Sequence, residues 1–291
     1  MLTMRNRSRI NVSMNKLRSD KRTQILHCLC EGNSVRATAR IADVSINTVV
    51  KLLCEAGTAC SKYQDEVLRN LQCRRLQTDE AWAFVGCKEK NATAEKKAKG
   101  CGDVWTWAAI DADTKLVPCW FIGNRDAGAA YHFMHDLKSR LANRVQLTTD
   151  GHRAYLNAVE DAFGCEIDYA MLVKIYGATP EDSEVRYSPA VCMGTRKGVI
   201  SGKPDFQHIS TSFVERQNLT MRMSMRRFTR LTNAFSKKLE NHEHAVALHF
   251  MHYNFCRIHQ SLRVTPAMEA GISDHVWSLN EVVEMIDRYS K

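Results

Sequence analysis

The sequence lacks the patterns that would place it in a membrane or in a secretory pathway. No apolar run approaches the roughly 18 residues that a membrane-spanning helix needs, so no membrane partner is expected. The first residues, MLTMRNRSRI, are basic but lack the apolar stretch of a secretory signal. These two absences predict a cytoplasmic protein.

The 11 cysteines contain no C-x-x-C pair, which argues against a zinc finger. Cys28 and Cys30 are two residues apart on an expected helix, so their side chains point to different faces. Since the count is odd and no export signal is seen, we expect reduced thiols packed as small hydrophobic side chains.

The net charge of +9 is concentrated in one part of the chain. Residues 1–75 hold 14 Lys and Arg against 6 Asp and Glu, a difference of +8. This concentration predicts a polyanionic partner, most simply nucleic acid. A solubilising tail would explain Arg5, Arg7 and Arg9 but not the positive charge that extends through residues 16–75.

Three short helices are predicted in the basic segment, at residues 21–32, 34–43 and 45–57. Asn33 or Ser34 can cap the second helix and Ser45 the third, because their side-chain oxygens accept backbone N–H groups at a helix start. Gly32 and Gly57 are expected to end the first and third helices, because glycine tolerates the left-handed conformation found there.

The spacing of these helices indicates a helix-turn-helix. Ala39 is small where two helices must approach, and Val44 and Val49 are apolar where the turn packs inward. Asp43 stands at a turn position where glycine is common, and Asp tolerates the left-handed conformation. The third helix would enter the major groove. The expected DNA-binding residues are Arg36, Arg40, Ser45, Asn47, Thr48 and Lys51. A helical bundle that serves packing alone is the alternative.

From residue 75 onward the pattern predicts a mixed five-stranded sheet flanked by helices, which is an α/β fold. Strands are expected at 75–87, on both sides of a turn at 111–115, at 144–151 and at 165–177, and helices at 126–143, 152–164 and 215–257. Four tryptophans are expected in the core: Trp82, Trp105, Trp107 and Trp120.

Three acidic residues stand out against this frame. Asp79 lies inside an apolar strand, where a carboxylate is costly unless it is paired or bound to a metal. Strand alternation places Asp79 and Glu80 on opposite faces, so we expect that they cannot both face one site. Asp150 ends a buried strand, and Glu215 begins a basic helix. Helix capping for Asp150 and a dipole interaction for Glu215 are the alternatives.

A pair of divalent ions about 3.5–4 Å apart would explain all three acids together. Their hard oxygen ligands favour Mg²⁺ or Mn²⁺ over zinc. Arg222 follows Glu215 by two helical turns and points to nearly the same face, where it can clamp a phosphate oxygen.

The motifs TDEAWAFVG, TTDGHRAYL and FVERQNLTMRMSMRRFTRLTNAFSKK, with the tail HYNFCRIHQSLRVTPAMEAG, occur in an order that resembles bacterial insertion-sequence DDE transposases. The nearest group is that of insertion sequence one. The resemblance covers residues 20–275. It implies an RNase H-like core, a catalytic triad of Asp79, Asp150 and Glu215, and a supporting role for Arg222.

The same resemblance implies binding to terminal inverted repeats, cleavage at the element ends and strand transfer into target DNA, with a homo-oligomer that joins two ends. Many members of that group begin with a cysteine-based zinc-binding module, which this chain lacks. End recognition would then rest on the helix-turn-helix.

The predicted organisation is a disordered basic arm (1–18), a helix-turn-helix domain with its linker (19–75), an RNase H-like catalytic domain (76–260) and a C-terminal tail and helix (261–291). Two other functions stay open: a DNA-binding regulator without catalytic activity, and a structure-specific nuclease without strand transfer.

Overall fold

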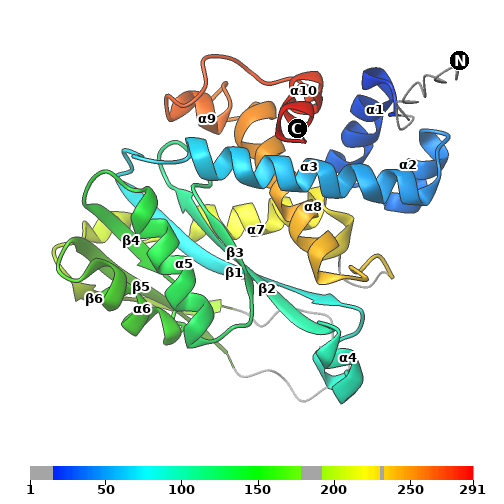
Figure 1. Ribbon diagram of the computed structural model, residues 1–291. Coiled ribbons are helices and arrows are strands. Elements are labelled where there is room, and N and C mark those ends of the chain that lie inside the picture. Colours follow the sequence, from blue (N-terminus) through cyan, green and yellow to red (C-terminus); the bar gives the residue numbers. More distant parts are fainter. Residues whose placement is uncertain (1–15, 178–191, 230–232, 291) are drawn as a thin grey trace, which may run out of the picture.

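The computed structural model describes residues 16–177, 192–229 and 233–290. The basic arm predicted at residues 1–18 therefore lies outside the described residues, apart from 16–18. Figure 1 shows a central sheet with helices on both sides, and the N-terminal and C-terminal helices gathered along one end of it.

Three N-terminal helices are present in the described chain, where the sequence predicts a helix-turn-helix. They are α1 (Ser19–Cys30), α2 (Val35–Ile41) and α3 (Ile46–Val67). The side chains of Ser34 and Ser45 accept the backbone N–H groups of Ala37 and Thr48, each at 3.1 Å, which confirms both expected caps. Asp43 has φ of 49°, so it occupies the left-handed turn position.

The third helix does not end at Gly57 as predicted, but continues for ten more residues to Val67. Glycine occurs at this position because α3 passes close to α8 (Leu239–Met251). A Cβ on Gly57 would lie 2.3 Å from Cβ of His244. Glycine is needed here for contact between two helices and does not act as a helix terminator.

In the described part of the chain, six strands form one mixed sheet in the order β3-β2-β1-β4-β5-β6. They are β1 (Arg75–Val85), β2 (Gly102–Asp111), β3 (Trp120–Gly123), β4 (Val145–Thr149), β5 (Ile167–Tyr176) and β6 (Cys192–Ser201). β1, β2 and β3 are antiparallel, β4 and β5 continue parallel to β1, and β6 is antiparallel to β5.

The mixed sheet is confirmed, but the prediction of five strands was wrong. The sequence of β6, CMGTRKGVIS, contains two glycines and two basic residues and shows no alternation. Most of its side chains are exposed or half-buried, so no buried face leaves a period of two in the sequence.

Two layers of helices cover the sheet (Figure 1). On one face, α5 (Ala127–Arg140) and α6 (Ala154–Phe163) pack on Trp107 through Phe133 and Tyr155. On the other face, α7 (Ser212–Ser224) and α8 cover Ala81 and Ala83 of β1. The remaining helices are α4 (Ala94–Ala98), α9 (Pro266–Glu269) and α10 (Leu279–Tyr289).

The core under α5 and α6 is continuous with that of the terminal helices. Buried side chains of α1 and α3, of β4 and β5 and of α10 all belong to one hydrophobic cluster. Residues 19–67 therefore share apolar packing with the sheet and with α10.

The helical region predicted over residues 215–257 is interrupted. α7 ends at Ser224, a 3₁₀ turn covers Arg226–Phe228, and α8 begins at Leu239. Between them Ser236 bridges Val85, and its carbonyl accepts the N–H of Gly86 at 2.8 Å. Ser236 thus pairs with the edge of β1 that β4 leaves open. The chain is not helical at this point because its backbone makes this pairing.

Three of the four tryptophans are less buried than predicted. Trp107 has 0% of its surface exposed and is a core residue as expected. Trp82, Trp105 and Trp120 are half-buried. Their positions on the sheet therefore leave part of each ring accessible.

We predict that Gly57→Ala destabilises the protein by roughly 1–3 kcal/mol, because the added methyl overlaps His244 and forces α3 and α8 apart. Urea unfolding measures the loss. Gly128→Ala is the matched control, since Gly128 lies in α5 with its nearest neighbour atom at 3.5 Å. Alanine is a better helix former than glycine, so this variant should be neutral or slightly more stable. Equal losses in both variants would contradict the packing argument.

Candidate metal centre

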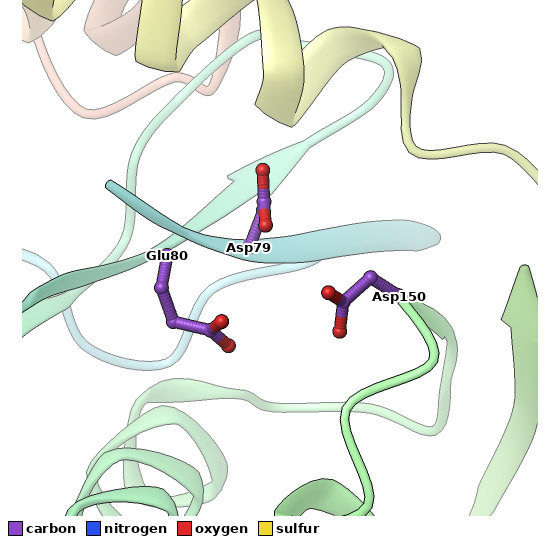
Figure 2. A group of neighbouring side chains, drawn as sticks. All are labelled: Asp79, Glu80 and Asp150. Carbon is purple, nitrogen blue, oxygen red and sulfur yellow. The ribbon is translucent and has the colours of Figure 1, made fainter. Parts of the chain in front are cut away.

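The end of the pairing between β1 and β4 brings two of the predicted acids together. The parallel register runs from Arg75↔Gln146 to Thr78↔Thr149 and stops there. The next residue on each strand is an aspartate, Asp79 and Asp150. Figure 2 shows their carboxylates near one another where the strands part.

Glu80 joins these two aspartates, contrary to the prediction that Asp79 and Glu80 cannot face one site. One carboxylate oxygen from each of Asp79, Glu80 and Asp150 lies within 4.8 Å of the others. Alternation does send the Asp79 and Glu80 side chains to opposite sides of β1 (Figure 2). Because Asp150 lies beyond the paired part of β4, no neighbouring strand separates the two faces at this point.

These three residues fit a divalent cation by their chemistry. All donors are carboxylate oxygens, and neither histidine nor cysteine joins the group among the described residues. Hard oxygen ligands of this kind suit Mg²⁺ or Mn²⁺. Two of the three side chains also carry a marked burial cost that a cation would offset.

Burial raises the pKa of Asp79 to about 6, and the charges of Asp150 and Glu215 add to this effect. Burial also raises the pKa of Glu80 to about 7, again with a contribution from the Asp150 charge. Hydrogen bonds to Asn218 and Arg125 oppose these shifts but do not cancel them. The crowded carboxylates therefore disfavour full ionisation until a cation is bound.

Arg125 neutralises part of this charge from the loop before α5. Its Nε donates to Glu80 Oε2 at 2.9 Å, and its Nη2 lies 3.5 Å from Asp150 Oδ2. The backbone N–H of His152 donates to Asp150 Oδ1 at 2.9 Å. Sequence reasoning missed both Glu80 and Arg125, because Glu80 was excluded by alternation and Arg125 lies outside any periodic pattern.

The side chain of Asp150 binds the turn that precedes α6 and does not cap the helix itself. The position that caps α6 is occupied by Arg153. The capping alternative for Asp150 therefore accounts for one of its carboxylate oxygens at most.

Helix α7 is attached to β1 by two side chains on the same face of the strand. Gln77 is buried, and its Oε1 accepts the N–H groups of Phe213 and Val214 at 2.8 and 3.2 Å. Two residues further, Asp79 Oδ2 accepts Nδ2–H of Asn218 at 2.8 Å. These contacts flank Glu215 and fix its helix against Asp79.

Glu215 is close enough for its charge to raise the pKa of Asp79, but it does not belong to the group of three oxygens. Its Oε2 lies 2.5 Å from Nζ of Lys174 on β5, and its Oε1 accepts the hydroxyl of Thr211. Arg222 lies in the last turn of the same helix. Lys174 thus provides the positive charge next to Glu215.

The expected DNA-binding residues lie on α2 and at the start of α3. Arg36, Arg40, Asn47 and Lys51 are exposed. Ser45 and Thr48 are hydrogen-bonded to each other at 2.8 Å as part of the helix cap, and Lys51 lies 4.0 Å from Glu55. Four of the six side chains are thus free of the local cap and face solvent.

No family model matches the chain, and no curated protein is similar to it. Among solved structures, the cryo-EM structure of a piggyBac transposase synaptic complex with hairpin DNA is similar at a TM-score of 0.39 and 11% identity. The match covers 99% of this chain and 76% of the other. Similarity at this level does not assign a family.

Within the described residues, no helix combines the length and the apolar character that crossing a bilayer requires.

We predict that Asp79→Asn stabilises the metal-free protein by roughly 2 kcal/mol at about pH 8 and leaves stability unchanged at about pH 3. The pKa of Asp79 is higher in the folded than in the unfolded chain, so stability falls as pH rises from about 4 to about 6. Above that range the wild type carries the full penalty, which Asn removes. Urea unfolding in the presence of a chelator measures it. A gain of equal size at both pH values would contradict the argument.

We predict that Gln77→Leu weakens Mn²⁺ binding by about tenfold. Two N–H groups at the start of α7 lose their acceptor, and the helix that carries Asn218, which donates to Asp79, is held less firmly. Titration calorimetry measures the affinity. Gln146→Leu is the matched control: Gln146 is also a buried sheet glutamine, but it bonds the backbone of Asp205 and not α7. Both variants should lose similar stability, and only the first should lose metal affinity. Equal metal affinities would count against the role of Gln77.

Proposed function

We propose that the chain is an insertion-sequence DNA transposase that binds terminal inverted repeats and catalyses metal-dependent strand cleavage and strand transfer. The observation that carries the proposal is the position of Asp79 and Asp150 next to each other, immediately after the last paired residues of β1 and β4. An acidic pair at the point where two adjacent parallel strands part is suited to hold a cation against a substrate outside the sheet.

The fold supports this proposal beyond the pair of acids. A three-stranded antiparallel meander joined to two parallel strands is the kind of mixed sheet that the RNase H-like resemblance implies. The helix-turn-helix keeps the exposed side chains of Arg36, Arg40 and Asn47 on its outer surface. The chain therefore combines a surface suited to DNA with a centre suited to metal ions.

Asp79, Asp150 and Glu215 would hold two Mg²⁺ or Mn²⁺ ions, which supply an activated water or 3′-hydroxyl and neutralise the leaving oxygen. Asn218 and Gln77 keep α7 against β1, so that Glu215 approaches from the face on which Asp79 lies. Arg125 and Lys174 bring positive charge to both sides of the acids, where a DNA phosphate would be held.

Glu80 is the alternative third carboxylate, since its oxygen already lies near those of Asp79 and Asp150. Glu215 would have to leave Lys174, whereas Glu80 would have to leave Arg125. Both residues can be tested by the same assay.

We predict that Asp79→Asn, Asp150→Asn and Glu215→Gln each reduce Mg²⁺-dependent nicking of element-end DNA by about a hundredfold or more, because each removes a proposed ligand. Glu80→Gln should reduce nicking less. Glu166→Gln is the control, because Glu166 is an exposed acid paired with Lys138. Cleavage of a labelled duplex that carries the element end measures the rate.

The assignment of Glu215 as the third metal ligand would be overturned if Glu80→Gln abolished nicking while Glu215→Gln left it intact. A wild type that binds end DNA and never cuts it would favour the DNA-binding regulator. Cleavage without joined products on a supercoiled target would favour the structure-specific nuclease. Substitution of Asn47, which reads the groove in this proposal, should weaken binding to end DNA and leave metal affinity unchanged.

A further inference from the structure

The β1–β2 hairpin carries a row of aromatic rings on the face that holds Glu80. Trp82 and Phe84 follow Glu80 at intervals of two along β1, and Trp105 is the β2 partner of Trp82. Phe235 extends the row, because its ring lies 4.8 Å from that of Phe84. We call these four residues the aromatic strip.

Core packing does not explain three of these rings. Trp82, Phe84 and Phe235 pack against none of the hydrophobic clusters that the described residues form. They contact one another instead, with 5.7 Å between the rings of Trp82 and Phe84. The hairpin extends beyond α5 and α6 toward α4 (Figure 1), so none of the described helices covers this part of the sheet face.

A cation lies over three rings of the strip. Arg125 is 5.0 Å from the centre of Trp105, Lys88 is 5.7 Å from Trp82 and Lys237 is 3.4 Å from Phe235. Lys88 and Lys237 are exposed and form no ion pair within the described part of the chain. On this face Asp103 lies opposite Phe84 and adds one negative charge; its carboxylate accepts the N–H of Glu89.

The strip joins two sites that the proposed function already uses. At one end Arg125 contacts Glu80 and Asp150. At the other end Phe235 and Lys237 line a cavity of about 890 Å³, together with Arg36 of α2 and Ile46 of α3. The lining of this cavity contains four Lys and Arg side chains and no acidic residue. The strip therefore lies between the acidic centre and a cavity that residues of α2 and α3 also line.

We propose that the aromatic strip binds an unpaired DNA strand, whose bases stack on the rings while its phosphates meet Arg125, Lys88 and Lys237. Flat rings interleaved with cations bind single strands without sequence preference, since every base offers a stacking face. In duplex DNA those faces are covered by neighbouring bases. The direction of the strand, from the helix-turn-helix to the acids, rests on the proposed function, whereas binding itself does not.

Fluorescence anisotropy with a labelled oligothymidine of about 15 nucleotides tests the proposal. Trp82→Leu and Phe84→Leu should each weaken binding about tenfold, and stacked bases should quench the wild-type tryptophan emission. Lys88→Ala should weaken binding and reduce its salt dependence by about one ion. Affinity for an element-end duplex should not change, because it rests on α3.

Trp120→Leu is the matched control. Trp120 is also a half-buried tryptophan of the sheet, but its ring packs on Phe250 of α8. Urea unfolding of each variant shows whether a loss of binding reflects a loss of fold, and Lys88→Ala carries no such risk because its side chain is exposed. Trp120→Leu should keep the affinity for oligothymidine.

Wild-type affinity in Trp82→Leu and Lys88→Ala would overturn the proposal, as would an equal loss for oligothymidine and duplex. If the wild type nicks element ends while these variants keep full affinity, the strip fails and the proposed function stands. If the variants lose oligothymidine and the wild type never nicks, the strip stands and the proposed function fails.

Discussion

The short parallel pairing of β1 with β4 sets the position of every acidic side chain in the candidate centre. Four pairs of residues hold the strands together, and the pairing stops where the first aspartate begins. Beyond that point the two faces of the sheet are open to one another, so carboxylates that alternation separates still approach one place. A longer β4 would place a paired backbone between the Asp79 face and the Glu80 face and close the centre.

The surrounding charges follow from the same arrangement. Carboxylates that are buried and close together resist ionisation. A cationic side chain on each face offsets this cost: Arg125 pairs with Glu80, and Lys174 pairs with Glu215. The sheet alone does not fix the position of Glu215, because this residue lies on α7. Gln77 and Asn218 hold α7, and with it Glu215, through hydrogen bonds whose partners lie more than a hundred residues apart in the chain.

Sequence reasoning predicted well what depends on local patterns. Caps at Ser34 and Ser45, the alternating strand around Asp79 and the buried strand before Asp150 were all readable, because period and capping chemistry are written in neighbouring residues. It failed where a distant partner decides. Glycine is required at position 57 by the contact with His244, and the conformation at Ser236 is set by its pairing with the edge of β1. Glu80 was excluded because side chains on opposite faces of a strand are kept apart by a paired neighbour. That argument does not apply beyond Thr78, where the pairing of β1 with β4 ends.

The length of helix α3 fixes how its two ends are placed relative to each other and to α8. Its 22 residues begin after the turn at Ser45 and pass the contact with α8 without a break, and at 1.5 Å per residue they form a rod about 33 Å long. Such a rod fixes both the distance and the angle between the start of α3 and its contact with α8. Adding one residue after the Gly57 contact would leave this geometry unchanged, whereas adding one before it would rotate the start of α3 by about 100° relative to α8.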